Sequence, residues 1–164
     1  MPGFYRSCID AFRESSYEII LPVGKDTESD SLGSTPPHIY RSVDQIAVLQ
    51  KADLFISHCG MNSVSESLWF GVPLVLFPQS YEQKGVALRT SPVGAGLMLT
   101  STRAIRETAE KVLHTPSYRE NARRISKNFS RCGCAKEGGT IDSGCYPPIN
   151  QNAARFFDMP LCVC

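Results

Sequence analysis

The sequence predicts an α/β domain in which helices cover both faces of a doubly wound parallel sheet. Residues 53–57 (DLFIS) and 74–77 (LVLF) are short apolar runs, as expected for strands that are buried on both faces. A glycine-containing turn and a helical pattern at residues 63–70 lie between them, which makes a β-turn-α-turn-β unit. The alternation continues on either side, and alternating strands and helices favour a parallel sheet.

Further elements precede this unit. Apolar residues at helical spacing predict a first helix, and they are Phe4, Cys8, Ala11 and Phe12. Residues 17–23 (YEIILPV) are rich in β-forming side chains and predict a strand that the proline closes. Residues 24–37 are rich in Gly, Ser, Thr, Asp and Pro, which indicates a loop. Residues 38–41 predict a short strand and residues 45–52 a short helix.

The segment after residue 77 adds a helix at residues 83–90 and a strand at residues 96–100 (GLMLT). Two more helices follow, and their apolar residues are Ile105, Ala109, Val112 and Leu113, then Tyr118, Ala122, Ile125 and Phe129. After about residue 133 no period is sustained, and Gly, Pro and Cys are frequent. We therefore expect a domain over residues 1–136 and an irregular tail, without an assigned function, over residues 137–164.

The composition excludes several classes of function. The chain has 164 residues, of which 42% are hydrophobic and 20% charged, as in an ordinary globular domain. Its net charge of +1 provides no field that favours nucleic acid, so no nucleic-acid partner is expected. No apolar run reaches the length of a membrane span, about 18 residues, and no signal-peptide pattern is visible. The seven cysteines lack metal-site spacing, so we expect reduced thiols, no metal and a cytoplasmic location.

The candidate chemistry lies in the turn at residues 58–63 (HCGMNS), which follows the first apolar strand. In such a sheet, ligands bind outside the carboxyl ends of the strands. Gly60 permits a close approach of the backbone to a ligand, Asn62 is the predicted N-cap, and Ser63 is the predicted first helical residue. The N–H groups of that helical turn form an anion site. His58 can donate a hydrogen bond to the same oxyanion.

Two more polar groups follow the phosphate-binding turn. Glu66 lies four residues after Asn62 on one helical side, where it can accept bonds from a ribose diol. Glu82 and Gln83 suit the vicinal hydroxyls of a sugar. This order favours a nucleotide diphosphate sugar. Each part also has a structural interpretation: Ser63 and Glu66 fit a capping box, His58 can be structural, and Glu82 with Gln83 can simply begin a helix.

Residues 55–83 (FISHCGMNSVSESLWFGVPLVLFPQSYEQ) closely resemble the signature of UDP-glycosyltransferases of the GT-B class, glycosyltransferase family 1. The nearest branch is the bacterial macrolide-glycosyltransferase-like one, and a looser resemblance covers residues 4–136. Such enzymes have two Rossmann-like domains: the N-terminal one holds the acceptor and the catalytic base, and the C-terminal one holds the sugar donor. This chain resembles the C-terminal domain.

The resemblance implies a donor-binding role for a set of residues, which are His58, Gly60, Asn62, Ser63, Glu66, Glu82, Gln83 and Gln45. The first four would meet the diphosphate and the fifth the ribose hydroxyls. Glu82 and Gln83 would meet the transferred sugar. Gln45 matches a family glutamine that meets the base.

The implied reaction is the inverting transfer of a hexosyl group, glucose by analogy, from a UDP-sugar to a small-molecule hydroxyl. No cofactor beside the UDP-sugar is implied. The catalytic base belongs to the N-terminal domain, so that domain or subunit is the expected partner, and the isolated chain is expected to be inactive. Two alternatives stay open: a stand-alone donor subunit of a split transferase, and a non-catalytic nucleotide-binding module.

Two departures from the family pattern carry expectations of their own. Relatives often place an aromatic-x-Pro-Gln run against the uracil ring, but residues 42–45 are Ser-Val-Asp-Gln here, and Tyr40 lies two residues earlier. Relatives also open the domain with a strand and a glycine-containing turn before the helix that begins here at Phe4. Without that strand, the sheet is expected to have an exposed edge or a gap beside the phosphates.

Overall fold

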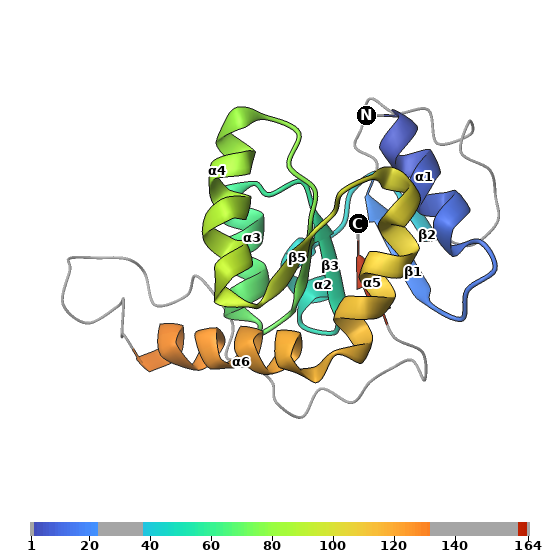
Figure 1. The fold of residues 1–164 in the computed structure, drawn as a ribbon. Coiled ribbons are helices and arrows are strands. Elements are labelled where there is room, and N and C mark those ends of the chain that lie inside the picture. Colours follow the sequence, from blue (N-terminus) through green and yellow to red (C-terminus); the bar gives the residue numbers. More distant parts are fainter. Residues whose placement is uncertain (1, 23–37, 132–160, 164) are drawn as a thin grey trace.

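The computed structural model describes residues 2–22, 38–131 and 161–163, and within these ranges it confirms the predicted α/β class (Figure 1). Six strands form one sheet in the order β2-β1-β6-β3-β4-β5, and all neighbouring strands are parallel. The strands are β1 (Glu18–Pro22), β2 (His38–Tyr40), β3 (Leu54–Ser57), β4 (Leu74–Leu76), β5 (Gly96–Met98) and β6 (Leu161–Val163).

Helices cover both faces of this sheet (Figure 1). They are α1 (Pro2–Phe12), α2 (Gln45–Leu49), α3 (Met61–Trp69), α4 (Tyr81–Thr90), α5 (Ile105–His114) and α6 (Pro116–Arg131). The cores show that α1 and α5 pack on one face, whereas α2, α3 and α4 pack on the other. None of the helices in the described ranges is long and apolar enough to cross a membrane.

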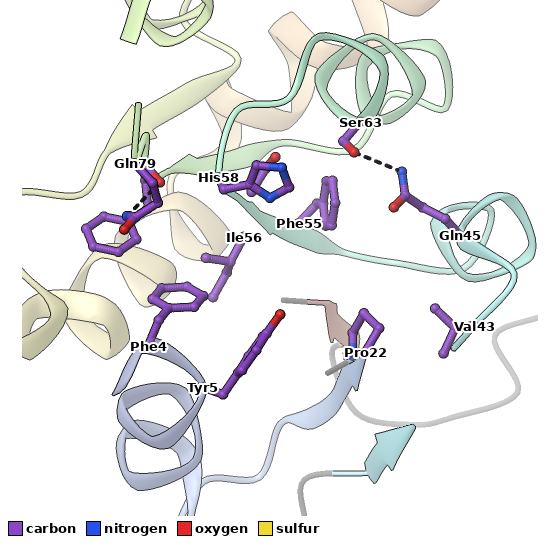
Figure 2. A pocket seen from close by; sticks show the side chains of 12 residues that line it. Phe4, Tyr5, Pro22, Val43, Gln45, Phe55, Ile56, His58, Ser63 and Gln79 are labelled. Atoms are coloured by element: carbon purple, nitrogen blue, oxygen red, sulfur yellow. Dashed lines mark hydrogen bonds between the residues drawn. The ribbon is translucent and has the colours of Figure 1, made fainter. Parts of the chain in front are cut away.

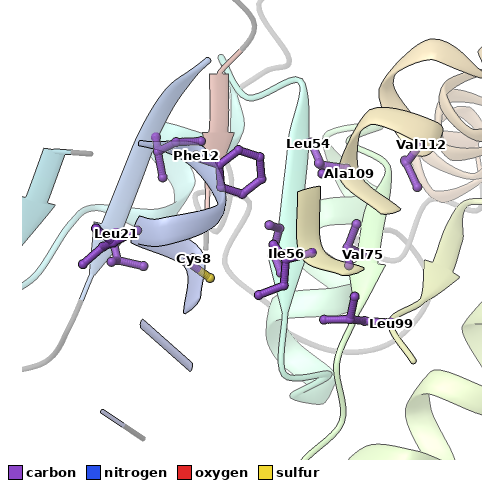
Figure 3. Close-up of a cluster of buried hydrophobic side chains, with 12 residues drawn as sticks. Cys8, Phe12, Leu21, Leu54, Ile56, Val75, Leu99, Ala109 and Val112 are labelled. Atoms are coloured by element: carbon purple, nitrogen blue, oxygen red, sulfur yellow. The ribbon is translucent and has the colours of Figure 1, made fainter. Parts of the chain in front are cut away.

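The alternation of side chains along β3 explains its uninterrupted apolar sequence. Leu54 and Ile56 pack into the core beneath α1 and α5 (Figure 3), whereas Phe55 packs into the core beneath α3 and α4. In β4, Val75 belongs to the first core, and both of its neighbours belong to the second. Both strands are therefore buried on two faces, as the sequence pattern predicts.

Helix α6 closes the end of the domain opposite to the carboxyl ends of the strands. Arg119 donates hydrogen bonds to the carbonyl oxygen and to Oδ1 of Asp53, both at 2.7 Å, at the residue before β3. Phe129 stacks on Trp69 of α3 with ring centroids 6.0 Å apart. These contacts hold α6 at the amino ends of the strands. Helix α6 therefore does not cover the carboxyl ends of the strands.

The sheet differs from the expectation in one respect. The sequence leads us to expect an exposed sheet edge or a gap beside the phosphates, but β6 lies between β1 and β3, and it comes from the tail that the sequence predicts to be irregular. Leu161 is in register with Glu18 on one side, and Cys162 is in register with Leu54 on the other. The predicted loop at residues 24–37 and the rest of the tail lie outside the described residues.

Candidate functional site

The turn after β3 contains a residue in the left-handed backbone region. Cys59 has φ 69°, and among the described residues it is the one non-glycine position with a positive φ. Such a conformation costs about 1–3 kcal/mol for an L residue. Two contacts hold it, because the Cys59 N–H donates to Oγ of Ser57 at 3.0 Å and its Sγ contacts the Ser57 carbonyl at 3.5 Å.

The thiol of Cys59 is fully buried, and this burial governs its chemistry. Burial raises its pKa from 9.0 to about 11, and a backbone hydrogen bond from Phe77 opposes the effect in smaller part. The thiol is therefore neutral at physiological pH. It packs in the turn, where burial disfavours the thiolate form that reactive cysteines use.

Helix α3 begins earlier than the sequence suggests. The predicted N-cap Asn62 is wrong: Gly60 is the N-cap, and the helix starts at Met61. The reason is the left-handed Cys59, which turns the chain early, so that Gly60 (φ −61°, ψ 136°) already leads into the helix. The capping box of Ser63 and Glu66 is excluded too, because Ser63 lies inside the helix.

Gly60 leaves the start of α3 open in two ways. It has no side chain, and no side-chain hydrogen bond caps this helix. A Cβ atom at Gly60 would lie 3.2 Å from Nε2 of His58, so the imidazole packs directly over the glycine. The glycine is needed for this close approach rather than for a positive φ, because its φ is ordinary for any residue.

A pocket lies at the carboxyl ends of β1 and β3, where the parallel-sheet argument predicts it (Figure 2). Its lining residues come from α1, from the ends of β1 and β3, from the first turns of α2 and α3, and from the segments before α2, after β3 and after β4: Phe4, Tyr5, Pro22, Val43, Gln45, Phe55, Ile56, Ser57, His58, Ser63, Phe77 and Gln79. Figure 2 shows the His58 ring between Gln79 on one side and Gln45 with Ser63 on the other. The imidazole and the start of α3 therefore share one pocket.

A hydrogen-bond network ties three of the predicted site residues together. Nε2 of Gln45 lies 2.6 Å from Oε2 of Glu66 and 3.3 Å from Oγ of Ser63. Gln45 is the first residue of α2, where Asp44 is the N-cap and accepts from the N–H groups of Ile46 and Ala47. The amide of Gln45 is thus fixed by a capped helix and by two acceptors on α3. The second carboxylate oxygen of Glu66 can accept from a ligand.

Of the predicted site residues, Gln45, His58 and Ser63 line this pocket, whereas Gly60, Asn62, Glu66, Glu82 and Gln83 do not. Gln83 completes a capping box instead: its Oε1 accepts from the N–H of Ser80 at 3.1 Å and of Gln79 at 2.7 Å, and Ser80 Oγ accepts from its N–H. The side-chain carbonyl oxygen of Gln83 therefore caps α4, as the structural interpretation predicts. The side-chain NH2 group of Gln83 takes no part in this capping box. Glu82 is exposed in the first turn of α4.

Several lining residues are not predictable as site residues from the sequence pattern. Phe4 belongs to the predicted apolar face of the first helix, but it also lines the pocket and stacks on Phe77 with ring centroids 5.0 Å apart. Tyr5 lines the pocket beside it, and its hydroxyl points inward in Figure 2. Tyr40, the aromatic residue nearest to the missing stacking position in the sequence, does not line the pocket, whereas Val43 does. The sequence offers one indication that Tyr5 could contribute to a site: this side chain with a hydroxyl group directly follows Phe4, which belongs to the apolar face of the first helix.

The described residues contain no group of three His, Cys, Asp or Glu side chains that could hold a metal ion. Cys8 and Cys59 are free thiols and both are buried. The pocket is lined by the imidazole of His58, by hydroxyl and amide side chains, and by apolar walls, and the carboxylate of Glu66 is bonded to the lining residue Gln45. This set suits a phosphorylated polyol with a flat ring.

Comparison with known proteins agrees with this geometry. The matching family model is described as the erythromycin biosynthesis protein CIII-like, C-terminal domain, and it covers residues 6–137. The NDP-glycosyltransferase YjiC of Bacillus subtilis (strain 168) is 40% identical over 141 residues, which make up 82% of this chain and 36% of that protein. The oleandomycin glycosyltransferase of Streptomyces antibioticus is 32% identical over 146 residues, or 85% of this chain and 33% of that protein.

Solved structures show the same partial correspondence. CalG4, the calicheamicin glycosyltransferase, superposes with a TM-score of 0.73 at 27% identity, over 81% of this chain and 36% of that one. The glycotransferase of kitacinnamycin superposes with a TM-score of 0.73 at 26% identity. The chain thus spans about a third of the length of the curated relatives it matches.

Proposed function

Since the chain belongs to the family of erythromycin biosynthesis protein CIII-like C-terminal domains, we propose that it binds the sugar donor of a glycosyltransferase reaction. Its fold is that of the C-terminal half of a GT-B glycosyltransferase. The proposed ligand is a UDP-sugar, with glucose as the transferred group. The proposed reaction transfers this sugar to a hydroxyl of a small molecule, with inversion at the anomeric carbon.

One observation supports the proposal most strongly: His58, Ser63 in the first turn of α3, and Gln45, which bonds Glu66, line a single pocket. In the proposed complex, the diphosphate accepts hydrogen bonds from the N–H groups at the start of α3 and from the side chains of His58, Asn62 and Ser63. A helix N-terminus stabilises such an anion because its N–H groups point outward and its dipole is positive there. The overall charge of +1 therefore does not prevent anion binding.

The Gln45–Glu66 pair is proposed to meet the nucleoside. The carboxylate of Glu66 accepts hydrogen bonds from the two ribose hydroxyls, and Gln45 holds it in position through the 2.6 Å contact. The base lies toward Val43 and Gln45, at the end of the pocket where both residues contribute to the lining. Glu82 and the amide N–H groups of Gln83 are proposed to reach the hexose, which extends out of the pocket toward α4.

In this reaction the domain stabilises the leaving diphosphate. Negative charge grows on the phosphate oxygens as the glycosidic bond breaks, and fixed hydrogen-bond donors lower the energy of that state. Activation of the acceptor hydroxyl is proposed to come from an N-terminal acceptor domain, because the chain corresponds to about a third of its full-length relatives. The chain without that domain is therefore proposed to bind the donor without transferring the sugar.

Calorimetric titration of the full chain with UDP-glucose tests the proposal. We expect saturable binding of UDP-glucose by the chain, and at least about tenfold weaker binding by the His58→Ala variant, because a charge-assisted hydrogen bond contributes ~1.5–3 kcal/mol. His114→Ala is the matched control, because His114 lies in the last turn of α5 and contacts Tyr17 away from the pocket. A folded chain that does not bind UDP-glucose at millimolar concentration contradicts the proposal.

A donor subunit that works with a separate acceptor chain is the second candidate. The continuity of the described sheet favours it, since β6 pairs with both β1 and β3. Addition of a purified acceptor domain from a full-length relative tests it. Transfer by the mixture, and by neither component alone, is the expected result, and the absence of complex formation contradicts it.

A further inference from the structure

Gln79, in the segment between β4 and α4, connects the pocket to the start of α4. Its side chain lines the pocket, and Figure 2 places it on the side of the His58 ring opposite to Gln45. Its backbone N–H donates to Oε1 of Gln83 at 2.7 Å, the same oxygen that caps α4. On the proposed path of the hexose, from the pocket toward α4, Gln79 therefore comes before Gln83.

The side-chain amide of Gln79 is oriented by a hydrogen bond. Its Nε2 donates to the carbonyl oxygen of Phe77 at 3.3 Å. Because a carbonyl oxygen can only accept, this contact fixes the NH2 group toward Phe77 and puts Oε1 on the other side of the amide. Within the described ranges, Oε1 of Gln79 makes no hydrogen bond, and the residue is exposed. Gln79 thus offers an oriented, accessible acceptor at the wall of the pocket.

The chemistry of this acceptor fits a place beside a diphosphate. In the proposed complex His58 donates to the diphosphate, and Gln79 lies on one side of the His58 ring. A diphosphate would repel a carboxylate at this place, but it does not repel a neutral amide oxygen in this way. The sugar hydroxyl nearest to the diphosphate is the one at C2, since C2 is bonded to the anomeric carbon that carries the phosphate.

On the basis of the donor-binding function proposed above, we propose that Gln79 determines donor specificity and that its Oε1 accepts a hydrogen bond from the 2-hydroxyl of the transferred sugar. The contact favours donors with a free 2-hydroxyl over donors that cannot donate a hydrogen bond from C2. Such analogues leave the amide oxygen without its partner, and a site with fixed polar groups discriminates between substrates in this way.

Calorimetric titration of the full chain with UDP, UDP-glucose and UDP-2-deoxy-2-fluoroglucose tests this contact. Fluorine is close to a hydroxyl in size but has no proton to donate. The variant is Gln79→Leu, which keeps most of the bulk without polar atoms. It should bind UDP-glucose about fivefold more weakly than the unmodified chain does, the effect of one neutral hydrogen bond. Its affinities for UDP and for the fluorinated donor should be unchanged, because neither ligand makes the bond.

Gln50→Ala is the matched control. Gln50 lies at the C-terminal end of α2 and does not line the pocket, so this variant should bind all three ligands as the unmodified chain does. The comparison of two ligands in two chains isolates the contact, because bonds between the 2-hydroxyl and other residues cancel.

The outcomes separate this contact from donor binding itself. If the unmodified chain binds UDP, but Gln79→Leu distinguishes UDP-glucose from the fluorinated donor as well as the unmodified chain does, the contact is overturned and donor binding stands. An equal loss of affinity for all three ligands in Gln79→Leu also overturns it, because the residue then supports the pocket and does not select the sugar. If the folded, unmodified chain binds none of the ligands, donor binding fails as well.

Discussion

Nε2 of Gln45 lies 2.6 Å from Oε2 of Glu66, so the first residue of α2 holds a carboxylate in the middle of α3. The two residues are 21 positions apart in the sequence, and Gln45 also lines the pocket. A carboxylate held in this way keeps acceptor capacity for a ligand, because one oxygen remains available beside the bonded one.

Removal of this carboxylate is expected to weaken nucleotide binding. Glu66→Ala should lower the affinity for UDP by about tenfold, since two hydrogen bonds to the ribose hydroxyls are lost. Glu107→Ala removes the same charge from an exposed position on α5 and serves as the control. Calorimetry measures both, and equal affinities of the two variants would show that Glu66 does not contact the nucleotide.

A methyl group at Gly60 is expected to displace the imidazole of His58. Its Cβ would lie 3.2 Å from Nε2, so Gly60→Ala should weaken UDP binding by about fivefold, or ~1 kcal/mol. Stability should fall by no more than about 1 kcal/mol, because the backbone already has a φ that alanine accepts.

Gly85→Ala is the control for this substitution. Gly85 lies inside α4, and a Cβ atom there would have nothing within 4 Å, so alanine should stabilise the helix by about 0.5–1 kcal/mol. It should leave UDP affinity unchanged. If Gly60→Ala binds UDP as tightly as Gly85→Ala, the close approach of His58 to Gly60 has no role in binding.

The buried thiol of Cys59 should make stability depend on alkaline pH. Its pKa rises from 9.0 to about 11 on folding because of burial, so the folded state keeps a proton that the unfolded state releases. The contribution is fully present below about pH 9 and is lost as the pH rises toward 11. Between about pH 8 and pH 10.5 the unmodified chain should lose about 2 kcal/mol more than Cys59→Ala. Urea unfolding at the two pH values measures this difference, and equal losses would contradict it.

The ion pair of Arg119 and Asp53 should stabilise the attachment of α6. Asp53 is 8% exposed, and Arg119→Met removes a guanidinium that bonds both its carbonyl and its carboxylate. We expect a loss of about 2 kcal/mol in the free energy of unfolding, reduced from the value for a fully buried pair because Arg119 is partly exposed.

Arg106→Met provides the comparison, since Arg106 pairs with Glu110 on the surface of α5. A surface pair of this kind should contribute less than about 0.5 kcal/mol. Thermal unfolding of the two variants measures the difference. Similar destabilisation by both would mean that the Asp53 pair is no stronger than a surface pair.

The sequence is sufficient for the elements whose pattern is local. The strands β3 and β4 are predictable because each is a short, uninterrupted apolar run, and in the structure each packs between two apolar cores. The first helix and the last two helices are predictable from apolar residues at helical spacing. His58 and Ser63 are predictable as members of one site because both follow β3, and ligands of a parallel sheet bind outside the carboxyl ends of its strands.

The remaining features depend on contacts that a local pattern does not record. The left-handed conformation of Cys59 is held by Ser57 and shifts the start of α3, yet a cysteine gives no sign of it in the sequence. The capping role of Gln83 depends on its rotamer. Strand β6 has only three residues, and its position is set by pairing with β1 and β3, which lie more than a hundred residues away.

Calorimetric titration of the full chain with UDP and, separately, with uridine tests the central claim most directly, because the two ligands differ in the diphosphate. If the start of α3 and His58 bind the diphosphate, UDP should bind at least about 100-fold more tightly than uridine, given ~1.5–3 kcal/mol for each charge-assisted hydrogen bond. Equal affinities for UDP and uridine, or no binding of UDP by the folded chain, would contradict the account.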